Sequence, residues 1–253
     1  MSYNPAYNPF SLVGKTILIT GASSGIGRAT AIECSKMGAT CIITGRNEQR
    51  LQETVNQLIG EGHQYIVADI ATQEGIDELV MQTPIVDGLV NNAGIGRNKP
   101  IAFYKQEDLT SVFQTNTFAP MLITKAMLKK KKINRGGSII FTSSVAAFRS
   151  TFGNGIYGAS KAALMSYMHY CANELAEKGI RANAIHPGMV ETPLIHGGSL
   201  SEEDLQKDVQ HYPLKRYGKP EEIAQLMVYL LSDASSWITG QSFIIDGGLT
   251  LQN

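Results

Sequence analysis

The sequence predicts an α/β fold in which one doubly wound parallel sheet of seven strands carries helices on both faces. Short β-branched runs alternate with longer helical patterns along the chain, as in repeated βαβ units. Several runs, including TILIT, CIITG, SIIFT and SFIID, are almost continuously apolar, which is typical of strands covered by helices on both faces. No linker or change in composition marks a second domain, so we expect the chain to form a single domain.

The expected strands and helices alternate from residue 16 to residue 246. We place strands at 16–20, 40–44, 64–69, 86–91, 137–143, 180–186 and 241–246. Helices fill the gaps at about 25–37, 47–60, 73–81, 105–131, 157–178 and 219–232. Pro220, Glu221 and Glu222 favour the start of the last helix, because proline and acidic side chains suit a first helical turn.

Two segments fall outside this alternation. Residues 1–12, rich in Asn and Pro, are expected to form a flexible arm before a single domain of residues 13–253. Residues 188–218 have no clear assignment and are too many for a plain connection, so we expect a substrate loop or lid there.

The composition excludes several classes of protein. In 253 residues, 22 Lys and Arg balance 22 Asp and Glu, which argues against nucleic-acid binding because that needs a surplus of cations. The three cysteines form no cluster with metal-ligand spacing. No apolar run has the length of a signal peptide or a membrane span. We therefore expect a cytoplasmic protein without a metal, a nucleic-acid partner or a membrane anchor.

A glycine-rich turn, T-G-A-S-S-G-I-G at residues 20–27, follows the first expected strand. A strand, a glycine turn and a helix N-terminus together form an anion site that can hold the pyrophosphate of a dinucleotide, as in Rossmann-type folds. The spacing is G-x-x-x-G-x-G instead of the commoner G-x-G-x-x-G. Taken alone, such a turn also fits a tight connection with no ligand.

The end of the second expected strand indicates which dinucleotide is bound. An acid near this position holds the ribose hydroxyl of NAD(H), whereas an arginine accommodates the 2′-phosphate of NADP(H). Here the strand ends Thr44-Gly45-Arg46-Asn47, without an acid. The guanidinium of Arg46 can pair with a phosphate in a bidentate fork, so the sequence favours NADP(H); the alternative is that Arg46 is a solvated residue at a helix start.

Tyr157 and Lys161 are four residues apart on an expected helix, so they share one face. A cation close to a phenol favours the phenolate, and the positive charge of an oxidised nicotinamide adds to this effect. We therefore expect a lowered Tyr157 pKa and a tyrosine able to act as a general acid or base. Ser144, with Ser143 as its neighbouring competitor, can donate a hydrogen bond to a carbonyl oxygen on which charge develops.

Five motifs in this order resemble those of the short-chain dehydrogenase/reductase family, in its compact single-domain branch. They are the glycine turn at 20–27, N-N-A-G at 91–94, the serine region at 144, Y-x-x-x-K at 157–161 and H-P-G-M-V-E-T at 186–192. The resemblance covers residues 15–248 and selects Ser144 over Ser143. It implies a catalytic tetrad of Asn116, Ser144, Tyr157 and Lys161, in which Asn116 relays protons from Lys161 to solvent.

The same resemblance implies which residues contact the cofactor. The glycine turn and the end of the second strand would hold the phosphates, the fourth strand the ribose, the third strand the adenine, and the segment after the sixth strand the nicotinamide. These residues are Gly21, Ser23, Ser24, Gly25, Ile26, Gly27, Arg46 and Asn47; Asn92, Ala93 and Gly94; Asp69 and Ile70; Pro187, Gly188, Val190 and Thr192; and Tyr157 and Lys161 themselves. His186 has no paired carboxylate or serine spacing, so we expect a structural role for it.

We expect segments 95–102, 145–156 and 188–218 to determine which substrate is bound, but their sequence does not identify it. Five apolar or aromatic residues in these segments suggest an apolar pocket: Phe148, Phe152, Leu194, Ile195 and Tyr212. The alternative is that such side chains pack against the loops that carry them. A ketone or secondary alcohol is the expected substrate. A 3-oxoacyl group, a hydroxysteroid and a sugar alcohol remain open alternatives, and a dinucleotide-binding regulatory protein without catalysis is the other class.

Two further expectations concern partners. Lys129, Lys130, Lys131 and Lys132, with Arg135 nearby, end a helix, where cations are favourable and usually solvated. Similarity to 3-oxoacyl-acyl-carrier-protein reductases implies that such residues dock an acidic carrier. The resemblance also implies a homotetramer whose four-helix contact uses apolar residues of the helices around 105–131 and 157–178: Val112, Phe113, Met121, Leu122, Leu164, Met165, Met168 and Cys171.

Overall fold

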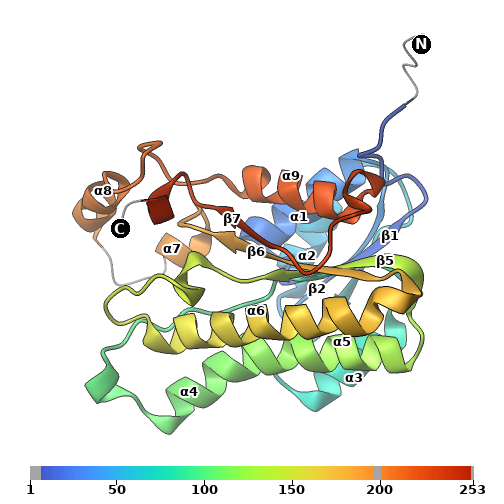
Figure 1. The fold of residues 1–253 in the computed structure, drawn as a ribbon. Helices are drawn as coiled ribbons and strands as arrows, with labels where there is room; N and C mark the ends of the chain where they lie inside the picture. The colour runs from blue at the N-terminus through green and yellow to red at the C-terminus, as the bar shows by residue number, and fades with distance from the viewer. Residues whose placement is uncertain (1–6, 197–200, 252–253) are drawn as a thin grey trace.

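The computed structural model describes residues 7–196 and 201–251. Its centre is a sheet of seven parallel strands in the order β3-β2-β1-β4-β5-β6-β7 (Figure 1). The strands are β1 (Thr16–Thr20), β2 (Thr40–Gly45), β3 (Gln64–Val67), β4 (Val86–Asn91), β5 (Ile133–Thr142), β6 (Arg181–Pro187) and β7 (Ser242–Ile245). This confirms the predicted doubly wound, single-domain α/β fold.

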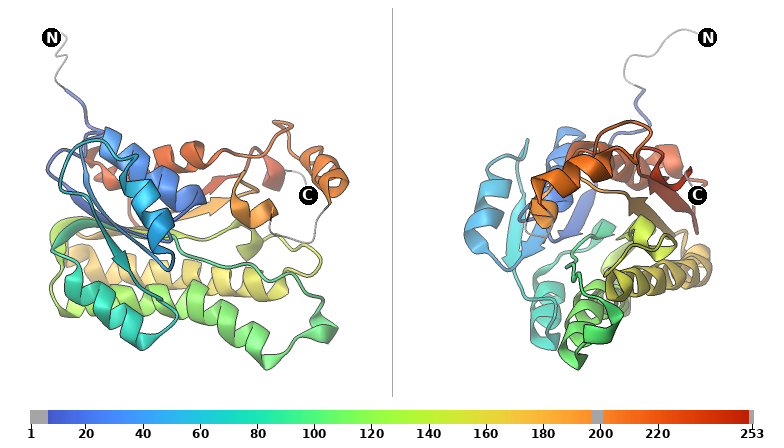
Figure 2. Two further views of the ribbon diagram at one scale, coloured as in Figure 1. Left: turned by 180° about the vertical axis from the view of Figure 1, so that it is seen from behind. Right: turned by 90° about the vertical axis from the view of Figure 1, so that its left-hand side faces the viewer.

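Helices cover both faces of the sheet, as the two layers in Figure 2 show. One layer consists of α1 (Gly25–Lys36), α2 (Glu48–Val55) and α9 (Pro220–Leu231); the other consists of α3 (Gln73–Gln82), α4 (Gln106–Phe113), α5 (Ala119–Lys129) and α6 (Gly155–Leu175). Neighbouring residues of one strand enter different cores. Leu18 packs with the second layer, whereas Ile17 and Ile19 pack with the first. This explains why the strand sequences are apolar without alternation.

Helices α4 and α5 replace the single helix expected at 105–131. Between them the chain widens into a π-helical segment, Gln114–Phe118, with Asn116 at its centre. Other boundaries also differ from expectation: α2 ends at Val55, and β5 begins at Ile133, before its two glycines. Short 3₁₀ turns complete the fold at Ile101–Phe103, Val145–Ala147, Ala176–Lys178, Asp233–Ser235 and Leu249–Leu251.

The segment expected to be a lid contains two helices, α7 (Pro193–His196) and α8 (Glu202–Val209), beyond one end of the sheet (Figure 1). The start of α8 is fixed by a capping box in which the Ser201 hydroxyl accepts from the Asp204 N–H at 3.1 Å. The segment of residues 188–218, called the lid segment below after this untested prediction, has its own small core, the lid core, in which Leu205, Tyr212 and Tyr217 pack against Val145 and Leu249. Residues 197–200 of this segment lie outside the described part.

The expectation of a flexible arm over residues 1–12 is wrong for its described second half. Leu12 is fully buried and its N–H donates to the Met37 carbonyl oxygen at 2.8 Å. The carbonyl oxygen of Pro9 accepts from the Ala234 N–H at 3.0 Å. The apolar side chain of Leu12 joins the core between β1, α1 and α9, which outweighs the Asn/Pro composition around it.

Within residues 7–196 and 201–251, no helix is long and apolar enough to cross a membrane. No group of three or more His, Cys, Asp or Glu side chains in that part of the chain could hold a metal ion.

Candidate active site

The glycine turn between β1 and α1 is packed too closely for any side chain at two positions. A Cβ atom on Gly27 would lie 2.3 Å from the Gly21 carbonyl oxygen, and one on Gly21 would lie 2.7 Å from the Ala93 Cα atom. Gly21 also has φ of +67°, a conformation that favours glycine. Ser24 precedes α1 without bonding its side chain to the first turn, so the N–H groups there stay available to an anion.

The Thr20 hydroxyl joins this turn to the end of β4. It accepts from the N–H groups of Asn92 and Ala93 at 3.0 and 3.1 Å. The Asn92 side-chain amide donates to the Thr20 carbonyl oxygen at 3.1 Å. The turn and the N-N-A-G segment, predicted separately as cofactor contacts, therefore form one rigid floor at the carboxyl ends of β1 and β4. Thr20 was not predicted to matter, although it is the first residue of the glycine motif.

Arg46 follows β2 at the same edge of the sheet and is exposed. It lines a hollow of about 410 Å³ between this edge and α4. The other residues lining that hollow are Ala71, Ile95, Gln106, Glu107, Thr110, Ser111, Gln114 and Thr115. Asn47 caps α2, accepting from the Arg50 N–H at 2.9 Å. The geometry thus leaves the Arg46 side chain facing solvent at the edge of the site and gives the Asn47 side chain a structural partner.

The predicted adenine contacts lie next to Arg46, after β3. The Ala68 N–H donates to the Gly45 carbonyl oxygen at 3.0 Å, which ties this segment to the end of β2. Asp69 turns the chain by accepting from the Ala71 N–H at 3.0 Å, and Ile70 is buried. Asp69 and Ile70 thus adjoin the Arg46 edge of the site.

The predicted nicotinamide contacts follow β6. Pro187 and Val190 are buried, and Val190 pairs with Gly218 across the lid segment. A Cβ atom on Gly25 would lie 3.1 Å from the Thr192 side chain, which places Thr192 over the glycine turn. A Cβ atom on Gly188 would lie 3.1 Å from Asp246, so the chain packs closely here and Asp246 would have to shift slightly to admit a side chain.

Tyr157 and Lys161 lie on the first turns of α6, as predicted. Lys161 is buried, and its ammonium lies 5.7 Å from the centre of the Tyr157 ring. That ammonium donates to the Thr142 carbonyl oxygen at the end of β5, at 2.7 Å. A Cβ atom on Gly94 would lie 3.2 Å from the Lys161 Nζ atom. The N-N-A-G segment therefore reaches the tyrosine–lysine pair, and the two predicted halves of the site are contiguous.

The pKa of Tyr157 does not follow the expected direction. Burial raises it above its ordinary value of 10, and the hydrogen bond with Ser144 opposes this rise. Burial also lowers the pKa of Lys161 from 10.5 to about 8. The expectation that the Tyr157 pKa is lowered is therefore wrong for the chain by itself, because burial has the largest effect on the pKa of both groups.

Ser143 and Ser144 are adjacent residues of the same type, but the structure gives them different surroundings. The Ser143 hydroxyl is buried and donates to the Lys161 carbonyl oxygen at 3.0 Å. The Ser144 hydroxyl accepts from the Ala146 N–H at 3.2 Å and lies close enough to the Tyr157 phenol to lower its pKa. Of the two serines, Ser144 is therefore the one that adjoins the phenol, which agrees with the motif spacing that selected it.

Asn116 is fully buried in the π-helical segment, beside the loop after β4. Its side-chain oxygen accepts from the Ile95 N–H at 2.8 Å. Its amide donates to the Ile95 carbonyl oxygen at 3.0 Å and to the Ser160 hydroxyl at 3.1 Å. The Ser160 hydroxyl donates in turn to the Tyr157 carbonyl oxygen at 2.7 Å. Ser160 was not predicted, although it lies within the Y-x-x-x-K motif.

The five apolar and aromatic residues expected to form an apolar pocket do not line one common surface. Tyr212 is buried in the lid core and its hydroxyl accepts from the Met189 N–H at 3.1 Å, so it packs instead of lining a pocket. Ile195 packs against the same core. Phe152 is 86% exposed and Phe148 about half exposed. Leu194 belongs to α7, but its side chain lies outside the described part.

One lysine of the run 129–132 has a structural role. The Lys132 ammonium donates to the carbonyl oxygens of Val80, Met81 and Thr83 at the end of α3. Lys129, Lys130 and Lys131 are exposed. Because Lys132 is occupied at a helix C-terminus, only the first three lysines can meet a partner.

Known proteins match this chain over nearly its whole length. The model of the family described as enoyl-(acyl carrier protein) reductase matches residues 21–250. The 3-oxoacyl-(acyl-carrier-protein) reductase FabG of Thermotoga maritima is 38% identical over 246 residues, which are 95% of this chain and 99% of that protein.

Solved structures agree with the sequence matches. A chain from Agrobacterium tumefaciens, provisionally described as a gluconate dehydrogenase, superposes with a TM-score of 0.90 at 32% identity, covering 96% of this chain and 98% of that one. Another from Beutenbergia cavernae, provisionally described as an NAD(P)-dependent gluconate 5-dehydrogenase with bound NADP at low occupancy, has a TM-score of 0.87 at 32% identity, covering 97% and 100%.

The fold, with its glycine turn at the first crossover and a tyrosine–lysine pair beyond it, defines a nicotinamide-dependent oxidoreductase. The chain belongs to the short-chain dehydrogenase/reductase family.

Proposed function

We propose that this protein transfers hydride between NADP(H) and a ketone or secondary alcohol, with Tyr157 as the general acid or base. The observation that carries the proposal is the meeting of three groups at the end of β5. The Ser144 hydroxyl is close enough to the Tyr157 phenol to lower its pKa, and the ammonium of Lys161 is held 5.7 Å from the phenol ring by the Thr142 carbonyl oxygen.

Each member of the tetrad has a role that follows from its surroundings. A tyrosine phenol carries its proton at neutral pH, so Tyr157 can donate it to a carbonyl oxygen during reduction. Ser144 donates a hydrogen bond to the same oxygen as negative charge develops there. The ammonium of Lys161 stabilises the phenolate that remains. Asn116 fixes the π-helical segment against the loop after β4 and donates to the Ser160 hydroxyl. Its expected role is to relay protons from Lys161 to solvent.

The chain's residues fit a dinucleotide. Gly21 and Gly27 leave a cradle that a single Cβ atom would fill, at the open N-terminus of α1. Asn92, Ala93 and Gly94 form the floor between that cradle and Lys161, with Asp69 and Ile70 at the adenine end and Pro187, Gly188, Val190 and Thr192 at the other. When bound, the reduced nicotinamide supplies the hydride.

The preference for NADP(H) rests on Arg46. It is exposed at the end of β2, and neither of the two residues that follow this strand, Arg46 and Asn47, is an acid that would hold a ribose hydroxyl or repel a phosphate. A guanidinium in this position can bind the 2′-phosphate through two parallel hydrogen bonds. The structure from Beutenbergia cavernae with bound NADP supports the same preference.

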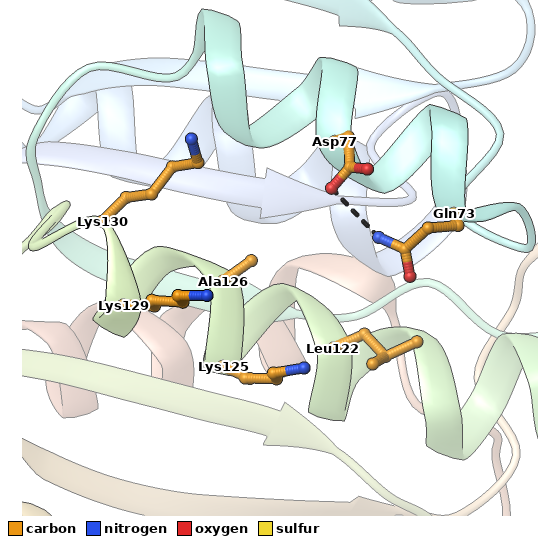
Figure 3. Close-up of a pocket in the computed structure, with 7 residues that line it drawn as sticks. All are labelled: Gln73, Asp77, Leu122, Lys125, Ala126, Lys129 and Lys130. Carbon is orange, nitrogen blue, oxygen red and sulfur yellow. Dashed lines mark hydrogen bonds between the residues drawn. The ribbon is translucent and has the colours of Figure 1, made fainter.

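An acyl-carrier protein is the partner that best fits the exposed lysines. Figure 3 shows Lys125, Lys129 and Lys130 along α5 and its end, opposite Gln73 and Asp77 on α3. These side chains line a groove of about 330 Å³ whose carboxylate, Asp77, accepts from the Gln73 amide at 3.0 Å. The similarity to FabG of Thermotoga maritima supports an acidic carrier as the ligand of this surface.

The carrier proposal is tested by kinetics on one substrate in two forms. Charge reversal in Lys129→Glu and Lys130→Glu should raise KM for a carrier-bound 3-oxoacyl group and leave the free thioester unaffected. Lys36→Glu, on the exposed end of α1 in the opposite helical layer, is the control for a change in total charge. Equal kinetics on both substrate forms in every variant would reject the carrier.

We also propose a cytoplasmic homotetramer, with a smaller contact than the sequence indicated. Val112, Leu164, Met168 and Cys171 are buried within the chain itself, so they are not free for a neighbouring subunit. Four of the expected residues remain partly exposed: Phe113, Met121, Leu122 and Met165. Phe118 and Tyr170, which are exposed on the same helices, extend this surface. Analytical sedimentation tests the subunit number.

The decisive experiment follows the absorbance of NADPH over a panel of ketones, with Tyr157→Phe as the blank. The panel contains 3-oxoacyl thioesters, oxidised sugar acids and ketosteroids, because the relatives differ in substrate. Oxidation that depends on Tyr157 with at least one ketone supports the proposal. NADPH binding without Tyr157-dependent oxidation of any ketone would favour a regulatory dinucleotide-binding protein instead.

A further inference from the structure

His186 is buried under the turn that carries Ser144. Ala182, Ala184 and His186 alternate along β6 and face the layer of α6. His186 is fully buried, and its Nδ1 atom lies 3.1 Å from the Ser144 carbonyl oxygen. A carbonyl oxygen can only accept, so Nδ1 carries the proton and the ring donates. The Nε2 atom has no hydrogen-bond partner among the described residues.

The imidazole replaces main-chain bonding that the sheet cannot provide here. The Ser143 N–H donates to the Ile185 carbonyl oxygen at 2.8 Å, which extends the ladder between β5 and β6 by one bond. The next donor along β6 would be the main chain of Pro187, which has no N–H. In place of that main-chain bond, the His186 side chain bonds to the carbonyl oxygen of Ser144, the residue after Ser143. It thereby holds the main chain at Ser144, where the hydrogen bonds between β5 and β6 have ended.

Two further contacts show that this turn is a single unit. Ser144 has extended backbone angles, and its hydroxyl accepts from the Ala146 N–H and lies close enough to the Tyr157 phenol to lower its pKa. Phe148, four residues after Ser144, packs against the imidazole with ring centres 5.3 Å apart. The imidazole thus contacts both ends of the turn 144–148.

The imidazole is suited to donate without carrying a charge. Burial lowers the pKa of His186; the hydrogen bond to Ser144 opposes this change, and the charges of Lys161 and His169 on α6 add to it. A neutral ring keeps its Nδ1 proton and places no second cation beside Lys161. Because the imidazole bonds to a backbone carbonyl and no carboxylate among the described side chains orients it, it does not resemble a catalytic histidine.

We propose that His186 is a positioning residue for the reaction above, and this inference rests on the proposed function. By donating to the Ser144 carbonyl oxygen it fixes the turn 144–148, so that the Ser144 hydroxyl stays aimed at the Tyr157 phenol and at the substrate oxygen.

Two amide variants test this because they move the donor by one atom. His186→Asn keeps an N–H group near the Nδ1 position, whereas His186→Gln carries it towards the Nε2 position, away from Ser144. Loss of one neutral hydrogen bond predicts that kcat falls about tenfold in His186→Gln and stays within about threefold of wild type in His186→Asn. The affinity for NADPH should be unchanged in both variants.

A double-variant cycle separates positioning from packing. If His186 acts through the Ser144 hydroxyl, His186→Gln should have no further effect on kcat in a Ser144→Ala background. A general packing role would lower kcat by the same factor in both backgrounds. Such an equal loss would overturn the inference.

The same inference has a readout that needs no activity. Ser144 opposes the rise in the Tyr157 pKa, so a misplaced Ser144 should raise it further. The Tyr157 pKa is measured by NMR with ¹³C-labelled tyrosine, the resonance being assigned with Tyr157→Phe. A rise in His186→Gln but not in His186→Asn supports the inference even if no ketone is reduced. An unchanged Tyr157 pKa in His186→Gln would refute it.

Discussion

The ammonium of Lys161 donates to the carbonyl oxygen of Thr142 at 2.7 Å, at the last residue of β5. This bond ties the reacting end of α6 to the sheet and leaves the ammonium beside the Tyr157 ring. The bond compensates only part of the cost of burying a charge, because the pKa of Lys161 still falls to about 8. The site therefore retains a buried cation that destabilises the fold by itself.

This cost predicts a pH dependence of stability. Between pH 8 and 10.5 the unfolded chain holds the Lys161 proton and the folded chain does not, so the free energy of unfolding rises with pH across this window. The rise attributable to Lys161 is at most about 3 kcal/mol. Urea unfolding of the cofactor-free protein at several pH values measures it, and Lys161→Met should lack the rise. Parallel curves for wild type and Lys161→Met would contradict the prediction.

Arg46→Ala should lower the preference for NADPH over NADH. Removal of a charge-assisted pair with a phosphate costs about 1.5–3 kcal/mol, so the ratio of the two affinities should fall by roughly 10- to 100-fold. Titration of each nucleotide measures this ratio, and Arg135→Ala controls for the loss of one positive charge far from the site. Equal nucleotide affinities in wild type, or an unchanged ratio in Arg46→Ala, would exclude the assigned role.

Lys132→Met should destabilise the fold without altering the reduction of a free ketone. It removes the bonds from one ammonium to three carbonyl oxygens at the end of α3, so the free energy of unfolding should fall by about 1–3 kcal/mol. Urea unfolding compares it with Lys131→Met, whose side chain is exposed. Equal midpoints for the two variants would show that Lys132 is as solvated as its neighbours.

Regular elements could be predicted from sequence because their patterns are local. TILIT over β1 and CIITG over β2 are apolar on both faces, and their strands appear within one residue of expectation. The start of β5 could not be placed, because Gly136 and Gly137 indicate a turn and yet lie inside the strand. Helix α8 was missed although Ser201 and Asp204 carry the spacing of a capping box.

The candidate site was predicted as two groups of residues, and the contacts that join them are not visible in sequence. Thr20 bonds to Asn92 across 72 residues, and Gly94 lies against the ammonium of Lys161. The direction of the Tyr157 pKa was also wrong, since spacing shows that Lys161 is near but not how far packing buries each side chain. Burial is a property of the packed structure, so only coordinates supply it.

The proposed role of Tyr157 is to deliver the proton while hydride is transferred, and single-turnover kinetics measure that step. With a ketone substrate and NADPH carrying deuterium at the transferred position, Tyr157→Phe should slow hydride transfer by about 10²- to 10⁴-fold, with a full primary isotope effect. Tyr157→Phe should still bind NADPH, because it removes only one hydroxyl group from the expected cofactor contacts. A Tyr157→Phe protein that transfers hydride at the wild-type rate would contradict the account.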